Sequence, residues 1–194
     1  MRGIDKYSET TVYTDSVKLP AGAYEVKIIR AEEQGDILCI LFDISEGEYK
    51  GYFMDKFHAD RQADPNGAKY KGVYRMWYES PKNDQERNEQ NRRRMKTALE
   101  RIKESNSLNI DYSREWDGAK LKDCRVGMIF RDEEYDYMGY QGFSARPYSI
   151  ITLSDLKEGK FKLPSPKHLK GGSAAAAPAP TAAAPVPLDD DLPF

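Results

Sequence analysis

Short stretches of alternating apolar and polar residues, separated by turn-forming residues, occupy the first third of the chain. Over 23–32 the alternation puts Val26 and Ile28 on one face, as in a β-strand with one side buried. The polar residues 33–36 form a short turn. The next stretch, 37–44, is apolar on both faces. We therefore expect a second strand whose outer side is covered by a helix, the N-terminal arm or another subunit.

The third stretch, 49–58, alternates as well and predicts a third strand. Its inward-facing set would be Tyr49, Phe53 and Phe57, and its outward-facing set would be Lys50, Tyr52, Lys56 and His58. A polar loop with a strong turn signal at 64–67 and a short aromatic segment over 73–79 follow.

One long helical pattern lies near the middle of the chain. Asn83 or Asp84 can cap this helix, which we expect to extend to about residue 104. Its apolar positions follow the i, i+3, i+4, i+7 spacing of a packed helix face and are Met95, Ala98, Leu99 and Ile102. The arginines over 92–94 are expected to be largely solvated.

After the helix, the pattern predicts a strand over 123–131 and a returning strand over 137–152, joined by a hairpin at 138–139. Three consecutive strands, one helix and then a two-stranded hairpin is the element order of an OB-fold. The sequence therefore predicts a mainly β protein with this fold: a five-stranded, partly open barrel with one helix between strands 3 and 4. An antiparallel sandwich built from the same strands is the alternative.

The end of the chain cannot add to that core. Residues 171–188 are almost entirely Gly, Ala and Pro, which offer little surface to bury. We expect a globular domain over 1–170, a disordered linker over 171–188 and an acidic tip over 189–194. No apolar run reaches the roughly 18 residues that span a membrane. The two cysteines, Cys39 and Cys124, lie in apolar runs, which suits a reducing cytoplasm.

The charges are unevenly placed. The tail after residue 170 holds three of the 32 acidic residues and none of the 30 basic ones, so residues 1–170 hold 30 basic and 29 acidic side chains. Between 50 and 103 there are 14 Lys and Arg against 8 Asp and Glu. A basic middle and an acidic end suggest a site for a polyanion and a separate element that binds proteins.

Aromatic and basic residues interleave in the basic middle. Flat rings can stack on bases and cations can neutralise phosphates, which is what a single nucleic-acid strand requires. Ordinary core packing explains some of the rings, such as Phe53 and Phe57. The predicted binding residues are Lys50, Tyr52, Lys56, Arg61, Lys69, Tyr70, Lys71, Tyr74, Arg75, Trp77 and Tyr78.

The closing hairpin is a less clear part of this predicted site. Tyr135, Tyr137, Tyr140 and Arg146 could stack on bases and pair with phosphates. The acidic residues among 132–136 stand beside them and would repel phosphate, unless they point away from the path of the strand.

The tip, Asp189-Asp190-Asp191-Leu192-Pro193-Phe194, offers carboxylates and an aromatic ring to a basic-rimmed apolar pocket. It resembles the C-terminal tip of bacterial single-stranded DNA-binding proteins, with Leu192 where isoleucine is more usual. The resemblance implies that these six residues bind enzymes of replication, recombination or repair. An acidic tail that only improves solubility is the alternative.

The body carries a second resemblance. The blocks over 19–24, 42–51, 130–135 and 158–161 are similar to those of small single-stranded DNA-binding proteins of phages and Firmicutes-type bacteria. This implies a protein that coats single-stranded DNA in the cytoplasm of a bacterium or of a phage-infected cell. The body is longer than that of the tetrameric bacterial proteins, so their oligomeric state does not carry over, and the resemblance leaves open whether the chain forms a homo-oligomer.

Enzymatic functions find less support in the sequence. Asp55, Asp60 and Asp64 could be offered as metal ligands of a nuclease, but two of them fall in the expected loop and no His or Glu completes a two-metal set. We expect no catalysis, no cofactor and no metal. The alternative binding function is an RNA-binding adaptor or chaperone that uses the same groove.

Overall fold

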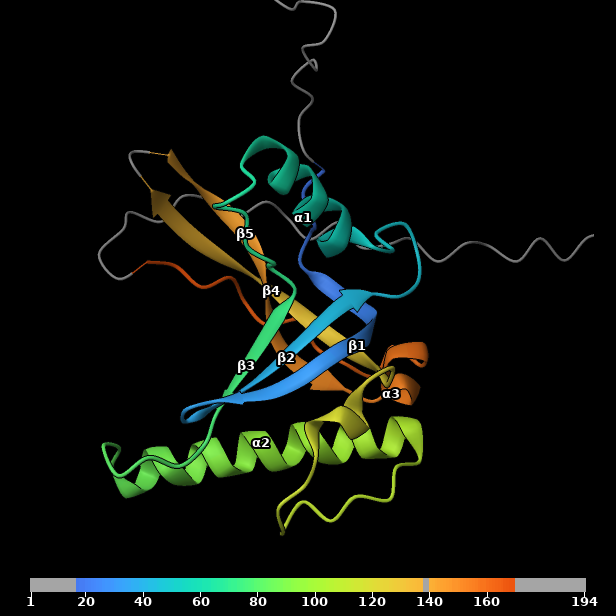
Figure 1. The fold of residues 1–194 in the computed structure, drawn as a ribbon, viewed down its shortest axis with the longest axis vertical. Coiled ribbons are helices and arrows are strands. Elements are labelled where there is room, and N and C mark those ends of the chain that lie inside the picture. Colours follow the sequence, from blue (N-terminus) through green and yellow to red (C-terminus); the bar gives the residue numbers. More distant parts are fainter. Residues whose placement is uncertain (1–16, 138–139, 170–194) are drawn as a thin grey trace, which may run out of the picture.

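A five-stranded antiparallel sheet forms the centre of the protein (Figure 1). The computed structural model describes residues 17–137 and 140–169. The strands are β1 (Gly22–Gln34), β2 (Ile37–Ile44), β3 (Val73–Trp77), β4 (Arg125–Tyr137) and β5 (Tyr140–Ile151). The remaining elements are α1 (Tyr52–Ala63), α2 (Gln85–Asn106), the 3-10 turn η1 (Gly118–Leu121) and α3 (Leu153–Lys157). Figure 1 shows α1 and α2 at opposite ends of the sheet.

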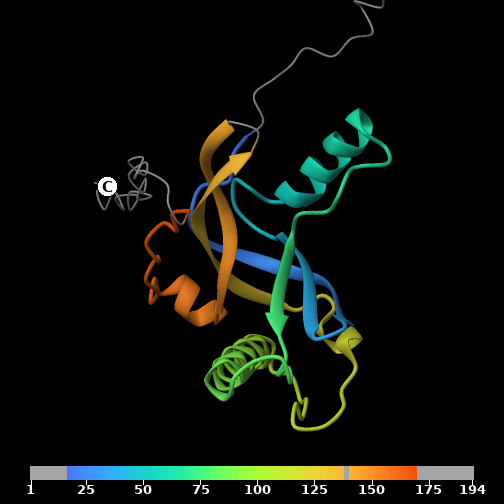
Figure 2. The same ribbon diagram turned by 90° about the vertical axis from the view of Figure 1, so that its left-hand side faces the viewer.

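The strand order β3-β2-β1-β4-β5 leaves β3 and β5 as the two edges of the sheet. The long strand β1 pairs with β4 over Gly22 to Lys27 and with β2 from Val26 onward, with a register shift between Ile28 and Arg30. This divided pairing curls the sheet until its edges face one another (Figure 2). The helix between strands 3 and 4 is as predicted for an OB-like fold, but α1 separates β2 from β3, and no ladder between β3 and β5 closes the barrel.

The core lies inside this curled sheet, and α2 packs across one end of it. Val26 and Ile28, the predicted inward positions of the first strand, are buried, and so is Phe130 of β4. On α2, the predicted apolar face is confirmed, because Ala98, Leu99 and Ile102 are buried and Met95 packs partly against them. The arginines at 92–94 are exposed, as expected. No helix in the described part of the chain is both long enough and apolar enough to cross a membrane.

The predicted bounds of several elements are close to those observed. The second strand is confirmed over its full length, and Cys39 on its second face is buried as its apolar pattern requires. Asp84 rather than Asn83 caps α2, because its carboxylate accepts a hydrogen bond from the backbone N–H of Arg87 at 2.7 Å. β4 extends to Tyr137, beyond the predicted end at 131, whereas β5 lies within the predicted stretch 137–152. The hairpin tip at 138–139, the linker at 171–188 and the tip at 189–194 lie outside the described residues.

The predicted third strand over 49–58 is wrong. This segment makes a turn and then forms α1, and the third strand is the short aromatic segment Val73–Trp77. The apolar residues Tyr49, Phe53 and Phe57 are four apart, which fits alternate positions of a strand and equally fits successive turns of a helix. The spacing alone therefore could not distinguish the two structures.

A carboxylate from β2 favours the helix. The two side-chain oxygens of Asp43 accept hydrogen bonds from the backbone N–H groups of Phe53 and Met54, both at 3.0 Å. These groups belong to the first turn of α1, where backbone donors have no partner within the helix. Gly51 precedes the helix with φ of 78°, a left-handed conformation that glycine adopts without strain.

Replacing Asp43 by Ala should lower the free energy of unfolding by about 1–3 kcal/mol, because it leaves the first-turn donors of α1 without this partner. Urea unfolding followed by circular dichroism measures the change. The matched control is Asp55→Ala, which removes an exposed carboxylate from the first turn of the same helix and should cost less than about 1 kcal/mol. Equal stability of Asp43→Ala and the parent would contradict the capping role.

Candidate functional site

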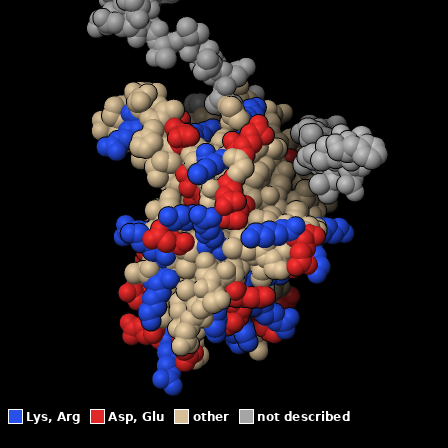
Figure 3. Space-filling model, turned by 90° about the vertical axis from the view of Figure 1, so that its right-hand side faces the viewer, with Lys and Arg blue, Asp and Glu red and all other residues tan. Residues whose placement is uncertain are grey.

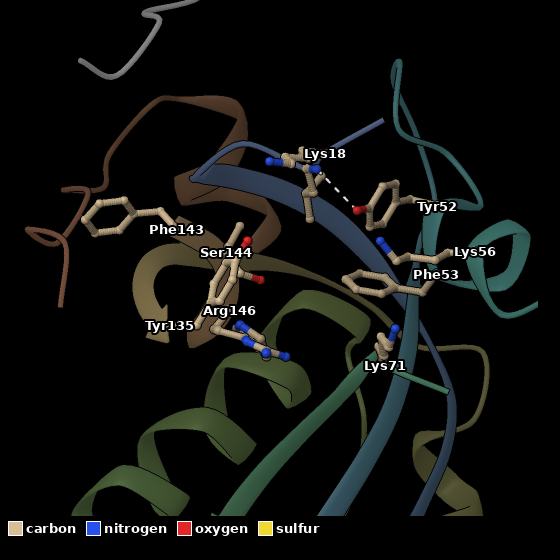
Figure 4. A pocket seen from close by; sticks show the side chains of 12 residues that line it. Lys18, Tyr52, Phe53, Lys56, Lys71, Tyr135, Phe143, Ser144 and Arg146 are labelled. Carbon is tan, nitrogen blue, oxygen red and sulfur yellow. Dashed lines mark hydrogen bonds between the residues drawn. The ribbon is translucent and has the colours of Figure 1, made fainter. Parts of the chain in front are cut away.

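A cleft of about 320 Å³ opens between α1, the entry to β1 and the β4–β5 hairpin (Figure 4). Its walls come from parts of the chain that are far apart in sequence. The residues that line this basic–aromatic cleft are Lys18, Leu19, Tyr52, Phe53, Lys56, Lys71, Tyr135, Phe143, Ser144, Ala145, Arg146 and Pro147. Four of them are cations and none is acidic, so the cleft suits an anionic ligand.

The cations of the cleft face one another across its opening. Figure 4 shows Lys56 extending into the cleft, with Lys71 on the same side and Arg146 on the opposite wall. The amine of Lys56 lies 5.8 Å from the ring centre of Tyr52, and that of Lys71 lies 2.9 Å from a carboxylate oxygen of Asp60. The Lys71 pair is partly exposed to solvent and therefore weak enough for a phosphate to compete with it. Arg146 is exposed and makes no ion pair with any residue from 17–137 or 140–169.

The rings of the cleft divide into structural and accessible ones. Phe53 is buried and stacks on Phe130 with the ring centres 6.0 Å apart, so it belongs to the core as expected. The ring of Phe143 points away from the opening and packs edge-on against His168. Tyr52 is half-buried, and its hydroxyl accepts a hydrogen bond from the N–H of Leu19 at 3.3 Å. Together with Tyr52, the partly exposed Tyr135 presents an aromatic surface to the cleft.

A second concave surface lies on the other side of the gap between β3 and β5, against α2. This arginine hollow has a volume of about 590 Å³. The predicted residues Tyr74, Arg75 and Trp77 line it, together with Met76, Asn91, Arg93, Arg94, Thr97, Ala98, Arg101, Arg131, Pro147, Tyr148, Ser149 and Ile150.

Tyr74 spans the gap that separates the cleft from the hollow. Its hydroxyl donates a hydrogen bond to the backbone carbonyl of Tyr148 at 3.4 Å, which links the two edge strands. Burial raises the pKa of Tyr74, although Arg94 and Arg101 act in the opposite direction. The hydroxyl therefore stays protonated at neutral pH and remains a donor.

The structure places the other predicted residues away from these two surfaces. Tyr70 turns inward, and its hydroxyl donates to the carbonyl of Phe42 at 2.9 Å, so it supports the fold. Tyr78 lines a separate, more apolar groove behind α2, where burial and Glu33 raise its pKa to about 12. The predicted residues that lie exposed outside the cleft and the hollow are Lys50, Arg61, Lys69, Tyr137 and Tyr140.

The acidic residues of the hairpin are largely occupied by neighbouring groups. Glu133 forms ion pairs with Arg131 and Lys167. Burial would raise the pKa of Glu133, but these two cations hold it below its usual value. Glu134 accepts hydrogen bonds from the segment 167–169, which runs beside β4. Their negative charge is thus partly neutralised beside the cleft, which lessens the repulsion that the sequence suggested.

Several residues that line the two surfaces were not predicted to bind: Lys18, Tyr148, Arg93, Arg94, Arg101 and Arg131. Lys18 lies in a turn before β1, and nothing in its local sequence marks it. The exposure of the arginines over 92–94 is as predicted, but the helical pattern does not reveal that β3 and β5 lie opposite them and Arg101.

The carboxylates considered as metal ligands have other roles. Asp60 pairs with Lys71, and Asp64 accepts hydrogen bonds from the backbone N–H groups of Asn66 and Gly67 in its own turn. Within residues 17–137 and 140–169, no three His, Cys, Asp or Glu side chains are grouped to hold a metal ion.

The face opposite the gap between β3 and β5 has a different charge pattern. In Figure 3, Lys and Arg side chains on that face lie beside Asp and Glu side chains. Such mixed charges are typical of a solvated surface. The lining of the cleft and of the hollow contains cations and no carboxylates, so both differ from this face.

Comparison with known proteins adds no assignment. No protein-family model matches the chain, and no curated protein matches it significantly.

Proposed function

We propose that this protein binds single-stranded DNA with little sequence preference and has no catalytic activity. The observation that carries the proposal is the basic–aromatic cleft. It combines four cations with the rings of Tyr52 and Tyr135 and has no acidic residue in its lining. Cations for phosphates and rings for bases are the two components of a sequence-tolerant single-strand site.

The architecture supports the same proposal. We infer that the curled sheet is an OB-like barrel left open between β3 and β5, with one helix between strands 3 and 4. OB-folds bind oligonucleotides on an open sheet face between flanking loops. Here the cleft lies beside the open edges and the β4–β5 hairpin forms one of its walls, which is a comparable position.

The ligand is a single strand rather than a duplex because the accessible rings lie within a concave surface. Unstacked bases can reach Tyr52 and Tyr135, whereas bases paired inside a duplex cannot expose their faces. In the cell such a protein would cover single strands exposed during replication, recombination or repair.

The first test is a fluorescence titration with oligo-dT, a matched duplex and oligo-rU at several salt concentrations. We expect tight binding to oligo-dT, much weaker binding to the duplex, and a steep loss of affinity as salt rises. Equal affinity for the RNA would favour the adaptor or chaperone function instead. Absence of binding to any single strand would refute the proposal.

A double variant, Lys56→Ala with Arg146→Ala, tests the cleft itself. If each cation neutralises one phosphate, the slope of log affinity against log salt should become shallower by about 1.4. The matched control is Lys120→Ala with Lys122→Ala, which removes two exposed lysines that line neither the cleft nor the hollow. An unchanged slope in the first variant would exclude the cleft as the binding site.

We further propose that Asp189 to Phe194 bind enzymes that act on the coated DNA, through a pocket that accepts both the ring and the carboxylates. Deleting Phe194 should abolish capture of a replication, recombination or repair enzyme from host lysate, while affinity for oligo-dT changes little. Replacing Asp189, Asp190 and Asp191 by Asn tests the charges separately. Identical sets of captured proteins from the parent and both variants would leave the tip as a solubilising tail.

A further inference from the structure

The arginine hollow is built by several elements that converge on one surface. Its five arginines come from three elements: Arg75 from β3, Arg93, Arg94 and Arg101 from α2, and Arg131 from β4. Its lining contains no Asp or Glu. Arg93 and Arg131 pair with carboxylates outside this lining, Glu89 and Glu133. The other three arginines repel one another, and an anionic ligand would relieve that repulsion.

Two of these arginines are held in place by the protein itself. Arg101 donates a hydrogen bond to the carbonyl of Ile150 at 2.5 Å, which ties α2 to β5. The guanidinium of Arg131 lies over the ring of Tyr148 at 4.6 Å from its centre. These contacts fix the walls of the hollow; the charge of Arg101 stays in place, whereas that of Arg131 is offset by its ion pair with Glu133.

Two others are free to bind a ligand. Arg75 and Arg94 are exposed, and their guanidinium groups make no hydrogen bond or ion pair with any residue in the described part of the chain. Beside them, Trp77 is 53% exposed, although a tryptophan ring is a costly side chain to leave in water. Arg93 differs, because it pairs with Glu89 on its own helix.

The hollow and the cleft are adjacent. Pro147 lines both, and the contact between the Tyr74 hydroxyl and the Tyr148 carbonyl marks the boundary between them. Lys71 lies in the cleft and Trp77 in the hollow, six residues further along an extended segment, or roughly 20 Å. The two surfaces therefore form one line of cations and rings along β3.

We infer that the hollow holds the continuation of the same DNA strand that occupies the cleft, with Arg75 and Arg94 contacting phosphates and Trp77 stacking on a base. This inference rests on the proposed function. A single small anion would not need a surface of this length. Arg94 and Arg101 are seven residues apart on α2, or about 10 Å along its axis. A spacing of this size suits successive phosphates of a chain.

The test compares oligo-dT of about 4 and about 16 nucleotides, the two ends of the usual range for one OB-fold. We expect Arg75→Ala with Arg94→Ala to weaken binding of the long oligonucleotide and to leave the short one nearly unaffected. Raising salt from 50 to 200 mM should lower the affinity of the parent for the long oligonucleotide by a factor about 7-fold larger than the factor for this variant. This is the difference expected for two lost phosphate contacts. Trp77→Ala should weaken binding of the long oligonucleotide roughly 5- to 150-fold without changing the salt slope.

The control is Arg87→Ala with Arg92→Ala, on the same helix but outside the lining of the hollow, and thermal unfolding checks that every variant is folded. If the parent binds long oligo-dT and the hollow variants bind it equally well, the inference is overturned while the proposed function stands. An equal loss for both lengths would also overturn it, because the hollow would then be the main site and not an extension. Failure of the parent to bind either oligonucleotide would overturn the proposed function itself.

Discussion

The divided pairing of β1 determines the shape of this protein. Its first residues pair with β4 and its later residues with β2, across a register shift between Ile28 and Arg30. One strand thus joins two halves of the sheet that point in different directions, and the sheet curls. Because of that curl, the edge strands β3 and β5 meet only through side chains such as Tyr74. Both concave surfaces lie beside the gap that remains.

An open gap suits binding better than a closed ladder would. If β3 and β5 paired along their length, main-chain hydrogen bonds would fill the space that the cleft and the hollow now occupy. Instead, α1 stands on one side of the gap and α2 on the other, and each helix directs cations toward it. The walls are fixed by contacts such as that of Arg101 with the carbonyl of Ile150, so a ligand would meet a surface that is already formed.

The electrostatics of the gap depend on where the acidic side chains are held. Glu133 and Glu134 belong to the hairpin that borders the cleft. Glu133 pairs with Arg131 and Lys167, and Glu134 accepts a hydrogen bond from the backbone N–H of Leu169. The cations Arg75 and Arg94 have no such partner among the residues described. This separation leaves a net positive surface on a chain whose formal net charge is −2. The net charge of the chain would not have indicated this positive surface.

The sequence alone determined the features that depend on local patterns: the first two strands, the apolar face of α2 and the start of α2 at Asn83 or Asp84, and the interleaved cations and rings. Only the tertiary structure decided the rest. The four-residue spacing of Tyr49, Phe53 and Phe57 fits a strand and a helix equally, and Asp43, ten residues before Phe53, favours the helix by hydrogen bonding to its first turn. Likewise, curling of the sheet, and no local pattern, brings segments far apart in the sequence together around one cleft. Periodicity records which side of an element is buried, but it carries no information about which element lies opposite.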